Sequence, residues 1–210
     1  LSEIAPVRRA SFSFCQYSSR YDRFKAGVVE NAFRPELANG ALMDLGVYCL
    51  AAAQLVFGAP DAVRASMFRL PGSIDGAGSV TLAYTHDDPL TGGGALADIA
   101  YSKISQGVNP CEIQGERGSL LIDSITRPKV WTLLPRDGSR HDGVRVAAAG
   151  AGSRTLDVRP PLHPMAYELL DFVRQLEQGP DPRFLEDSRA VLAVMDEARR
   201  QTGLELPAGR

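Results

Sequence analysis

The sequence has few of the residues that mark disulfide-bonded or metal-binding proteins. Its three cysteines, Cys15, Cys49 and Cys111, are odd in number, lie far apart and form no CxxC pair. This spacing argues against a zinc ribbon and against a disulfide framework. The three histidines do not cluster in the sequence either, so we expect no metal site. Buried free thiols are typical of a reducing compartment, and we therefore expect a cytoplasmic protein.

Long apolar runs and an excess of one charge are also missing. The longest apolar stretch, Cys49–Phe57, is interrupted by Gln54 and is far shorter than the ~20 residues of a membrane helix. The 23 Lys and Arg residues nearly balance the 25 Asp and Glu residues, which argues against a general binder of nucleic acid or anionic membranes. We therefore expect neither nucleic acid nor a membrane as partner.

The beginning of the chain shows no targeting signal of its own. The first ten residues, LSEIAPVRRA, contain no apolar segment of the signal-peptide type. The chain starts at Leu1 and not at Met. We therefore expect it to be a piece of a longer protein, in which a targeting segment could lie upstream.

A glycine-rich nucleotide-binding motif is absent as well. Gly76-Ala77-Gly78 and Gly150-Ala151-Gly152 lack the third glycine of G-x-G-x-x-G, and Gly92–Gly94 precedes a predicted strand and not a helix. A P-loop, a G-x-S-x-G turn and an H-E-x-x-H helix are missing too. We expect this chain to bind no dinucleotide on a Rossmann unit of its own.

The residues that are present predict a strand-rich globular domain. The 210 residues are 44% hydrophobic and 23% charged, close to globular averages. Short gaps between the predicted strands leave no room for helical crossovers, so most strand pairs should be antiparallel. Alternation and turn signals predict strands at Val7–Tyr17, Val63–Leu70, Ser79–Tyr84, Ala95–Tyr101, Cys111–Gln114, Ser119–Asp123, Val130–Leu134, Gly143–Ala147 and Thr155–Val158.

Three helices complete the predicted fold. We expect them at Asn39–Phe57 with Asn39 as its cap, at Pro164–Gln178, and at Asp187–Thr202 with Asp187 or Ser188 as its cap. The polar segment 18–37 reads as a long loop with one helical turn at Pro35–Ala38. The order of elements predicts an α+β fold in which helices cover one face of a large, mostly antiparallel open sheet. We expect residues 1–210 to form one domain.

The helix at 39–57 carries the most conspicuous polar pair. Asp44 and Tyr48 are four residues apart, so their side chains share one face of a helix. Spacing alone leaves two interpretations open. The pair is either a buried tyrosine hydroxyl satisfied by a carboxylate, which is common in cores, or an acid–base pair in a catalytic site.

A family resemblance bears on this choice. The segment 40–49, GALMDLGVYC, resembles the helix that opens the substrate side of the Gfo/Idh/MocA oxidoreductases, the family of glucose–fructose oxidoreductase and inositol dehydrogenase. Weaker likenesses follow in the expected order along nearly the whole chain. They lie at Gln16–Asp22, Tyr101–Lys103, Glu112–Leu120, Tyr167–Phe172 and the helix 187–203.

The resemblance implies a role for each member of the pair. Tyr48 stands where members similar to dihydrodiol dehydrogenase and glucose–fructose oxidoreductase have their acid–base residue, and other members have His there. A nearby carboxylate makes a phenol a weaker acid, so Asp44 cannot activate Tyr48. By analogy Asp44 orients Tyr48 or the family's catalytic Lys through a hydrogen bond. That Lys belongs to a preceding domain that is not part of this chain.

Four further residues are candidate substrate contacts. Tyr17, Arg20 and Lys25 lie between the first predicted strand and the helix, and Lys103 follows a predicted sheet strand. All four side chains can hydrogen-bond a polyhydroxylated substrate. The alternatives, a solvated basic loop and an ordinary strand lysine, stay open.

The resemblance also implies partners. It implies an enzyme that binds NAD or NADP mainly on an N-terminal Rossmann domain and acts on a sugar, polyol or related hydroxy compound. The alternative is a non-catalytic sugar-binding or oligomerisation module. It further implies a homodimer or homotetramer formed through the sheet face away from the helices. Candidates for either face of the sheet are Val80, Leu82, Tyr84 and Ile99.

Overall fold

A computed structural model describes residues 1–136 and 152–204, and eight of its strands form one sheet. Their order is β2-β3-β4-β1-β5-β6-β7-β8, and only β1 and β4 are parallel. The predicted α+β fold with a mostly antiparallel sheet is confirmed. The strands are β1 (Val7–Cys15), β2 (Ala62–Leu70), β3 (Ile74–Tyr84), β4 (Ala95–Ser102), β5 (Cys111–Gly115), β6 (Gly118–Ile122), β7 (Val130–Pro135) and β8 (Arg154–Asp157).

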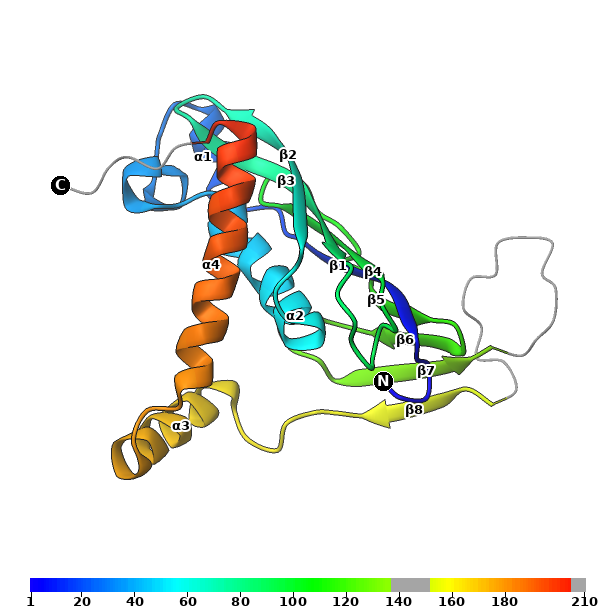
Figure 1. Cartoon of the computed structure of the whole chain (residues 1–210). Coiled ribbons are helices and arrows are strands. Elements are labelled where there is room, and N and C mark those ends of the chain that lie inside the picture. Colours follow the sequence, from blue (N-terminus) through cyan, green and yellow to red (C-terminus); the bar gives the residue numbers. More distant parts are fainter. Residues whose placement is uncertain (137–151, 205–210) are drawn as a thin grey trace.

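Helices cover only one face of this sheet (Figure 1). The helix α2 (Val47–Phe57) packs on β1 and β4, and α4 (Pro182–Thr202) packs on β2 and on α2. In β1 the alternating side chains of Ala10 and Phe12 point to this covered face and are buried. The core therefore lies between the middle of the sheet and the two helices, and no helix of the described residues covers the opposite face.

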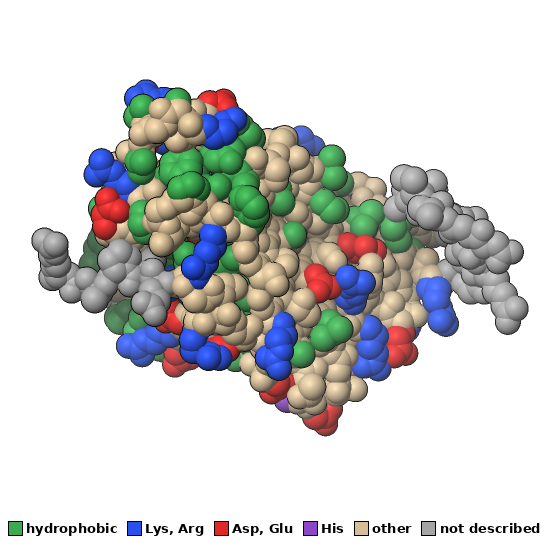
Figure 2. Space-filling model, turned by 90° about the horizontal axis from the view of Figure 1, so that it is seen from above, with side chains coloured by type: hydrophobic (Ala, Val, Ile, Leu, Met, Phe, Trp, Pro, Cys, Tyr) green, Lys and Arg blue, Asp and Glu red, His purple; other side chains and the backbone are tan. Residues whose placement is uncertain are grey.

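The two faces of the sheet differ in chemistry. Val80, Leu82, Tyr84 and Ile99, which the sequence allowed on either face, are at most 2% exposed and belong to the core under the helices. Viewed from above, much of the molecular surface is uncharged, and hydrophobic side chains gather mainly at one end (Figure 2). A shallow depression across β1, β3 and β4 is lined by small polar residues, including Ser11, Ser13, Ser79, Thr81 and Asp98.

The predicted helix at 39–57 begins differently from the prediction. Residues Leu42–Gly46 form a π-helical turn that leads directly into α2. Asn39 is not the cap, because its side-chain amide donates to the carbonyl oxygen of Asn31 at 2.7 Å. The N–H of Leu42 instead donates to the carboxylate of Asp75 at 2.7 Å. The hydrogen-bond acceptor for the first turn of the helix therefore comes from a residue distant in sequence, and a local sequence pattern cannot predict such a contact.

The polar segment before this helix contains more helix than predicted. A short helix, α1 (Tyr21–Lys25), and a 3₁₀ turn at Asn31–Phe33 were both missed. The predicted turn at Pro35–Ala38 appears as a 3₁₀ turn at Pro35–Leu37. Phe33 is buried against Leu70 and Ile74, and this packing holds an otherwise polar loop on the sheet.

The closing helices agree only in part with the prediction. The helix α4 starts at Pro182, because Asp181 caps it by accepting from the N–H of Arg183. The helix α3 (Pro164–Gln178) has the predicted bounds but contains no buried residue. It projects from the start of α4 away from the sheet (Figure 1), so the expectation that both helices cover the sheet is wrong for α3. Its exposed apolar side chains are Met165, Leu169, Leu170, Phe172, Val173 and Leu176.

The structure also bears on the predicted strand at 143–147, on the three cysteines and on metal-binding side chains. The predicted strand Gly143–Ala147 lies outside the described residues. Cys15, Cys49 and Cys111 are free thiols, and the last two are buried. In residues 1–136 and 152–204 no three His, Cys, Asp or Glu side chains form a group that could hold a metal ion.

One segment is long and apolar enough to span a membrane by length and composition, Pro35–Phe57. Half of its most apolar stretch is buried within the molecule, and α2, which it contains, packs on two strands and on α4. Core helices pass this composition test as readily as membrane spans, so it is weak evidence for a membrane.

Candidate functional site

A polar recess lies at the start of the π-helical turn. Its volume is about 660 Å³, and its walls come from the loop before the helix and from the turn itself. Arg20 and Asp44, which the sequence selected as separate candidates, both line it. The structure therefore brings together two predicted residues that are far apart in the sequence. The full lining is Arg20, Val29, Glu30, Asn31, Ala32, Arg34, Asn39 and Asp44.

Lys103 lies directly beneath this recess. Its side chain is only 2% exposed, and its ammonium group donates to Asp44 at 3.0 Å and to the carbonyl oxygen of Ala32 at 2.7 Å. The ammonium group also lies 4.8 Å from the centre of the Phe33 ring, within cation–π range. Lys103 thus fastens both Asp44 and the loop 31–33 to the sheet. A molecule in the recess would meet Asp44 before Lys103.

Asp44 combines a buried cation with an open face. Its carboxylate is bound to Lys103 on one side, but the side chain is 52% exposed and lines the recess. A carboxylate can accept several hydrogen bonds at once. Asp44 can therefore accept hydrogen bonds from hydroxyl groups in the recess while Lys103 balances its charge.

Tyr48 lies one turn further along the same helix. It is 49% exposed, and the edge of its ring packs against Phe14 with the ring centres 5.6 Å apart. Among the described residues no hydrogen bond joins Asp44 to Tyr48, whose separation in sequence had suggested one. The interpretation as a buried tyrosine satisfied by a carboxylate is wrong, because both side chains are about half exposed. The phenol is accessible from solvent.

Tyr17 and Lys25 belong to a neighbouring cluster centred on Asp22. The hydroxyl of Tyr17 donates to Asp22 at 2.6 Å, and Lys25 donates to the Tyr17 hydroxyl at 3.1 Å and binds Asp22 at 2.8 Å. The Lys25 and Tyr17 hydrogen bonds hold the pKa of Asp22 below its usual value, and Asp22 raises the pKa of Lys25. The cluster fixes α1 beside the recess.

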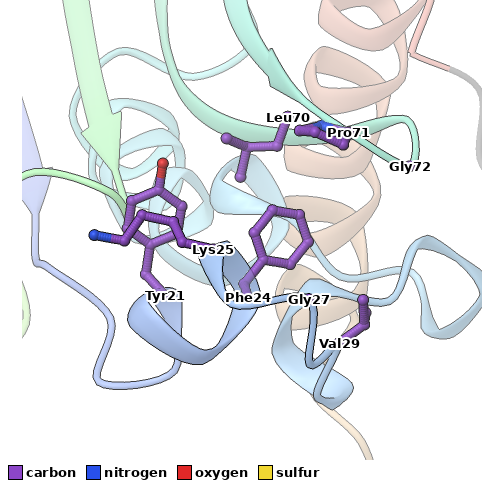
Figure 3. Close-up of a pocket in the computed structure, with 8 residues that line it drawn as sticks. All are labelled: Tyr21, Phe24, Lys25, Gly27, Val29, Leu70, Pro71 and Gly72. Atoms are coloured by element: carbon purple, nitrogen blue, oxygen red, sulfur yellow. The ribbon is translucent and has the colours of Figure 1, made fainter.

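An apolar pocket opens next to this cluster. It lies between α1 and the turn that joins β2 to β3, has a volume of about 410 Å³, and is lined by the rings of Tyr21 and Phe24 together with Leu70 (Figure 3). Lys25 lines one side of it, with its ammonium group 5.1 Å from the centre of the Tyr21 ring. Of the predicted substrate contacts, Lys25 therefore borders this apolar pocket, whereas Arg20 borders the polar recess.

Four polar residues of the recess were not predicted from the sequence as site residues: Glu30, Asn31, Arg34 and Asn39. Glu30 binds Arg20 at 3.1 Å and Arg23 at 2.9 Å, so it holds the two arginines against the loop. The sequence feature that indicated this region was the long polar loop before the helix, because such loops are often functional. That signal marks a region but does not select residues within it.

Comparisons with known proteins agree with one another on the fold. A model of the GFO/IDH/MocA C-terminal domain family matches residues 3–121. The scyllo-inositol 2-dehydrogenase (NADP(+)) IolU of Bacillus subtilis is 39% identical over 208 residues, covering 99% of this chain and 58% of that protein. The uncharacterized oxidoreductase YgjR of Escherichia coli is 34% identical, covering 99% of this chain and 57% of that protein.

Solved structures show the same fold at low sequence identity. The 3-ketoreductase KijD10 of Actinomadura kijaniata, solved with NADP and TDP-benzene, gives a TM-score of 0.68 at 18% identity and covers 93% of this chain and 54% of that chain. The aldose-aldose oxidoreductase of Caulobacter crescentus gives 0.64 at 19% identity, with 95% and 55% covered. This chain therefore spans a little over half the length of the proteins that it matches.

Proposed function

This chain belongs to the Gfo/Idh/MocA family of oxidoreductases, and on that premise we propose that it is the substrate side of an NADP-dependent enzyme acting on a sugar or polyol hydroxyl. The observation that carries the proposal is the polar recess, where Asp44 bound to Lys103 lies one helical turn from the accessible phenol of Tyr48. The relative with 39% identity is named for the oxidation of an inositol with NADP.

The residues of the recess suit a molecule with several hydroxyl groups. Asp44 accepts a hydrogen bond from one hydroxyl, and the two asparagines, Asn31 and Asn39, each offer a donor and an acceptor. Arg20 offers further donors, and Glu30 keeps its guanidinium in place. Such paired donors and acceptors recognise polyols and reject apolar molecules of the same size, which would leave these groups unpaired. Tyr17 and Lys25 stay predicted contacts at the outer edge of the site.

Tyr48 handles the proton of the reacting hydroxyl in this proposal. Oxidation of a secondary alcohol to a ketone removes a hydride from carbon and a proton from oxygen. Tyr48 is exposed, so its phenolate form can take that proton, and the resulting phenol can return it in the reverse reaction. Asp44 holds the same hydroxyl or its neighbour in position. The ammonium group of Lys103 balances the negative charge of Asp44.

The nicotinamide cofactor supplies the hydride acceptor or donor when it is bound. In the described residues no glycine-rich turn joins a strand to a helix, which fits a cofactor held mainly by another domain. We propose that residues 1–210 form one domain of a longer polypeptide and that a preceding domain holds NADP. In this proposal the preceding domain completes the active site beside the recess.

Two further features belong to this proposal. The helix-free face of the sheet presents small hydroxyl side chains, such as Ser11 and Thr81, which allow two sheets to approach closely. We propose a homodimer or homotetramer formed through this face, and analytical ultracentrifugation showing a monomer at micromolar concentration would contradict it.

The free thiols of Cys49 and Cys111 support a cytoplasmic location, and neither membrane nor nucleic acid is a proposed partner.

The test measures turnover of a panel of inositols, aldoses and polyols by the full-length protein. The formation of reduced nicotinamide reports the reaction. We expect NADP-dependent oxidation of at least one cyclic or open-chain polyol. Saturable binding of polyols without any turnover would instead favour a non-catalytic sugar-binding module. Absence of both turnover and polyol binding would refute the proposed function.

A further inference from the structure

A buried carboxylate lies beneath the π-helical turn, and neither its sequence context nor the proposed reaction explains it. Asp75, the second residue of β3, is 1% exposed. One of its oxygens accepts the N–H of Leu42 at 2.7 Å. The other oxygen is buried and has no hydrogen-bond partner among the described residues. Each unsatisfied buried polar atom costs free energy of folding, so this arrangement has a stability cost.

Burial is the strongest influence on the Asp75 carboxyl group. Burial raises the pKa of its carboxyl group, even though the Leu42 hydrogen bond and the charge of Lys103 act in the opposite direction. The hydroxyl of Tyr101 nearby is also buried without a partner. Well-packed apolar residues often replace buried charged groups at no loss of stability. Stability alone therefore gives no reason for a carboxylate at this position.

The chain before the helix is shaped around this carboxylate. Gly40 has a φ of +151°, and a Cβ atom on it would lie only 2.0 Å from the unpartnered oxygen of Asp75. Only glycine allows the backbone to pass this close. Two residues later the chain reaches Leu42, whose N–H binds the same carboxylate. The backbone on the way into the turn is thus held against Asp75 by close approach and by a hydrogen bond.

The turn that Asp75 holds is the one that carries Asp44. Leu42–Gly46 winds as a π-helix, a rare geometry that persists mostly at functional sites. The first N–H groups of a helix have no partner within the helix, and a fixed acceptor there sets where the helix starts. The π winding changes the direction in which residues after Leu42 point, and Asp44 is the third residue of the turn.

We propose that Asp75 is a positioning residue: by fixing the N–H of Leu42 it sets the π-helical turn that presents Asp44 to the recess and to Lys103. This inference rests on the proposed function for its catalytic consequence. The structural part, that Asp75 holds the turn, stands on the geometry alone. Loss of the acceptor lets the turn relax toward α-helical winding, which moves Asp44 away from its position over Lys103.

The first test measures amide hydrogen exchange in the full-length protein. Asp75→Leu removes the acceptor, Asp75→Asn keeps an oxygen that can accept from Leu42, and Gly40→Ala leaves the carboxylate but pushes it aside. We expect exchange within residues 40–48 to be about tenfold faster in Asp75→Leu and Gly40→Ala and nearly unchanged in Asp75→Asn. The matched control is Gln201→Leu, which removes two hydrogen bonds between its side chain on α4 and the backbone of β2.

The second test measures kcat, KM and cofactor affinity for the same variants. We expect kcat to fall about tenfold to a hundredfold in Asp75→Leu, as for other small displacements of catalytic groups, with cofactor affinity kept. Asp75→Asn should restore most of kcat, and Gln201→Leu should keep it. Exchange that is unchanged in Asp75→Leu would overturn the inference, and so would a kcat equal to that of Gln201→Leu. A wild type without turnover would refute the proposed function instead, and the exchange result alone would then decide whether Asp75 holds the turn.

Discussion

At the scale of single residues, the accessible phenol of Tyr48 has the most direct consequence. Replacing it with Phe removes only the hydroxyl, so cofactor binding should stay unchanged. If that oxygen takes the proton, kcat of the full-length enzyme should fall by about 10²–10⁴-fold. Steady-state kinetics and a cofactor titration would check this. The control is Tyr167→Phe, the same change at an exposed position on α3. An unchanged kcat in Tyr48→Phe would show that Tyr48 does not take part in the reaction.

Lys103 should matter for folding as well as for the site. Lys103→Met keeps much of the side-chain volume but leaves the Ala32 carbonyl and Asp44 without their bond to the ammonium group. We expect a loss of about 1–3 kcal/mol in the free energy of unfolding, measured by urea denaturation. The exposed Lys25→Met is the control and should leave the free energy of unfolding nearly unchanged, because exposed ion pairs contribute little. Equal effects of the two substitutions would show that the buried lysine holds nothing in place.

Some of these residues could be predicted from the sequence as members of the site, and others could not, for physical reasons. Asp44 and Tyr48 were found because helical spacing places residues four apart on one side. The burial of Lys103 was not evident, because it depends on Phe33 and Ala32, which reach it from a loop some seventy positions earlier. Asp75 gave no signal at all, since its partner Leu42 is on another element and its own neighbours in sequence are unremarkable.

At the scale of elements, β3 depends on a glycine that the sequence analysis considered only as a nucleotide-binding candidate. Gly78 pairs with Tyr101 of β4, and a Cβ on it would lie 2.3 Å from the hydroxyl oxygen of Tyr101 and 2.9 Å from the carbonyl oxygen of Ser66. The Tyr101 ring is buried and cannot swing away freely. Gly78→Ala should therefore lower the free energy of unfolding by about 1–3 kcal/mol.

Gly94→Ala provides the matched control for this substitution. A Cβ on Gly94 would meet nothing within 4 Å, so we expect a change within about 0.5 kcal/mol. Chemical denaturation of both variants would compare them. Equal effects would mean that the contact with Tyr101 does not cause the loss of stability at Gly78.

The cap of α4 should make stability depend on pH. The side chain and the N–H of Arg183 lower the pKa of Asp181 to about 2. Because the folded-state pKa lies below the unfolded value, the cap stabilises the protein at neutral pH and loses that effect as pH falls from about 4 toward 2. Asp181→Ala should lower Tm at pH 7, and the difference from wild type should shrink toward pH 2. Glu186→Ala on the same helix is the control, and a difference independent of pH would contradict the assignment.

Element types were easier to predict than element ends. Strands β4 to β7 agree with the prediction to within a residue or so, because alternation and turn residues are local signals. The starts of α2 and α4 were wrong. Asp75 on strand β3 accepts from the turn that leads into α2, and Asp181 caps α4 so that it starts at Pro182, five residues earlier than predicted. The extra start of β3 at Ile74 was missed, since its glycines resemble a turn.

At the scale of the whole molecule, α3 leaves a large apolar surface. Six of its apolar side chains are between 49% and 71% exposed, whereas exposed apolar residues on a protein surface are usually scattered singly. The 210-residue chain by itself should therefore bind a hydrophobic dye and associate as its concentration rises. Dye fluorescence and light scattering would measure this.

Leu169→Gln with Leu176→Gln should reduce both signals from the α3 surface. Leu55→Gln with Leu96→Gln changes two leucines that are exposed elsewhere and is the matched control. The prediction fails if the two double variants reduce dye binding equally. The amphipathic pattern of α3 was visible in the sequence, but the sequence could not show that none of its apolar side chains is buried by the described residues.

The central place of β1 determines when this sheet can be completed during synthesis. The strand made first lies between β4 and β5 and is paired through Phe12 with Ile99 and through Ala10 with Ile113. Contacts between residues so distant in sequence form slowly, because a long loop must close before they form. On the ribosome, β1 has no partner strand until β4 has emerged, and its other edge stays unpaired until β5 follows, although β2 and β3 can already pair as a hairpin. A nascent chain that stalls before β5 would expose one edge of its first strand to chaperones and to other chains.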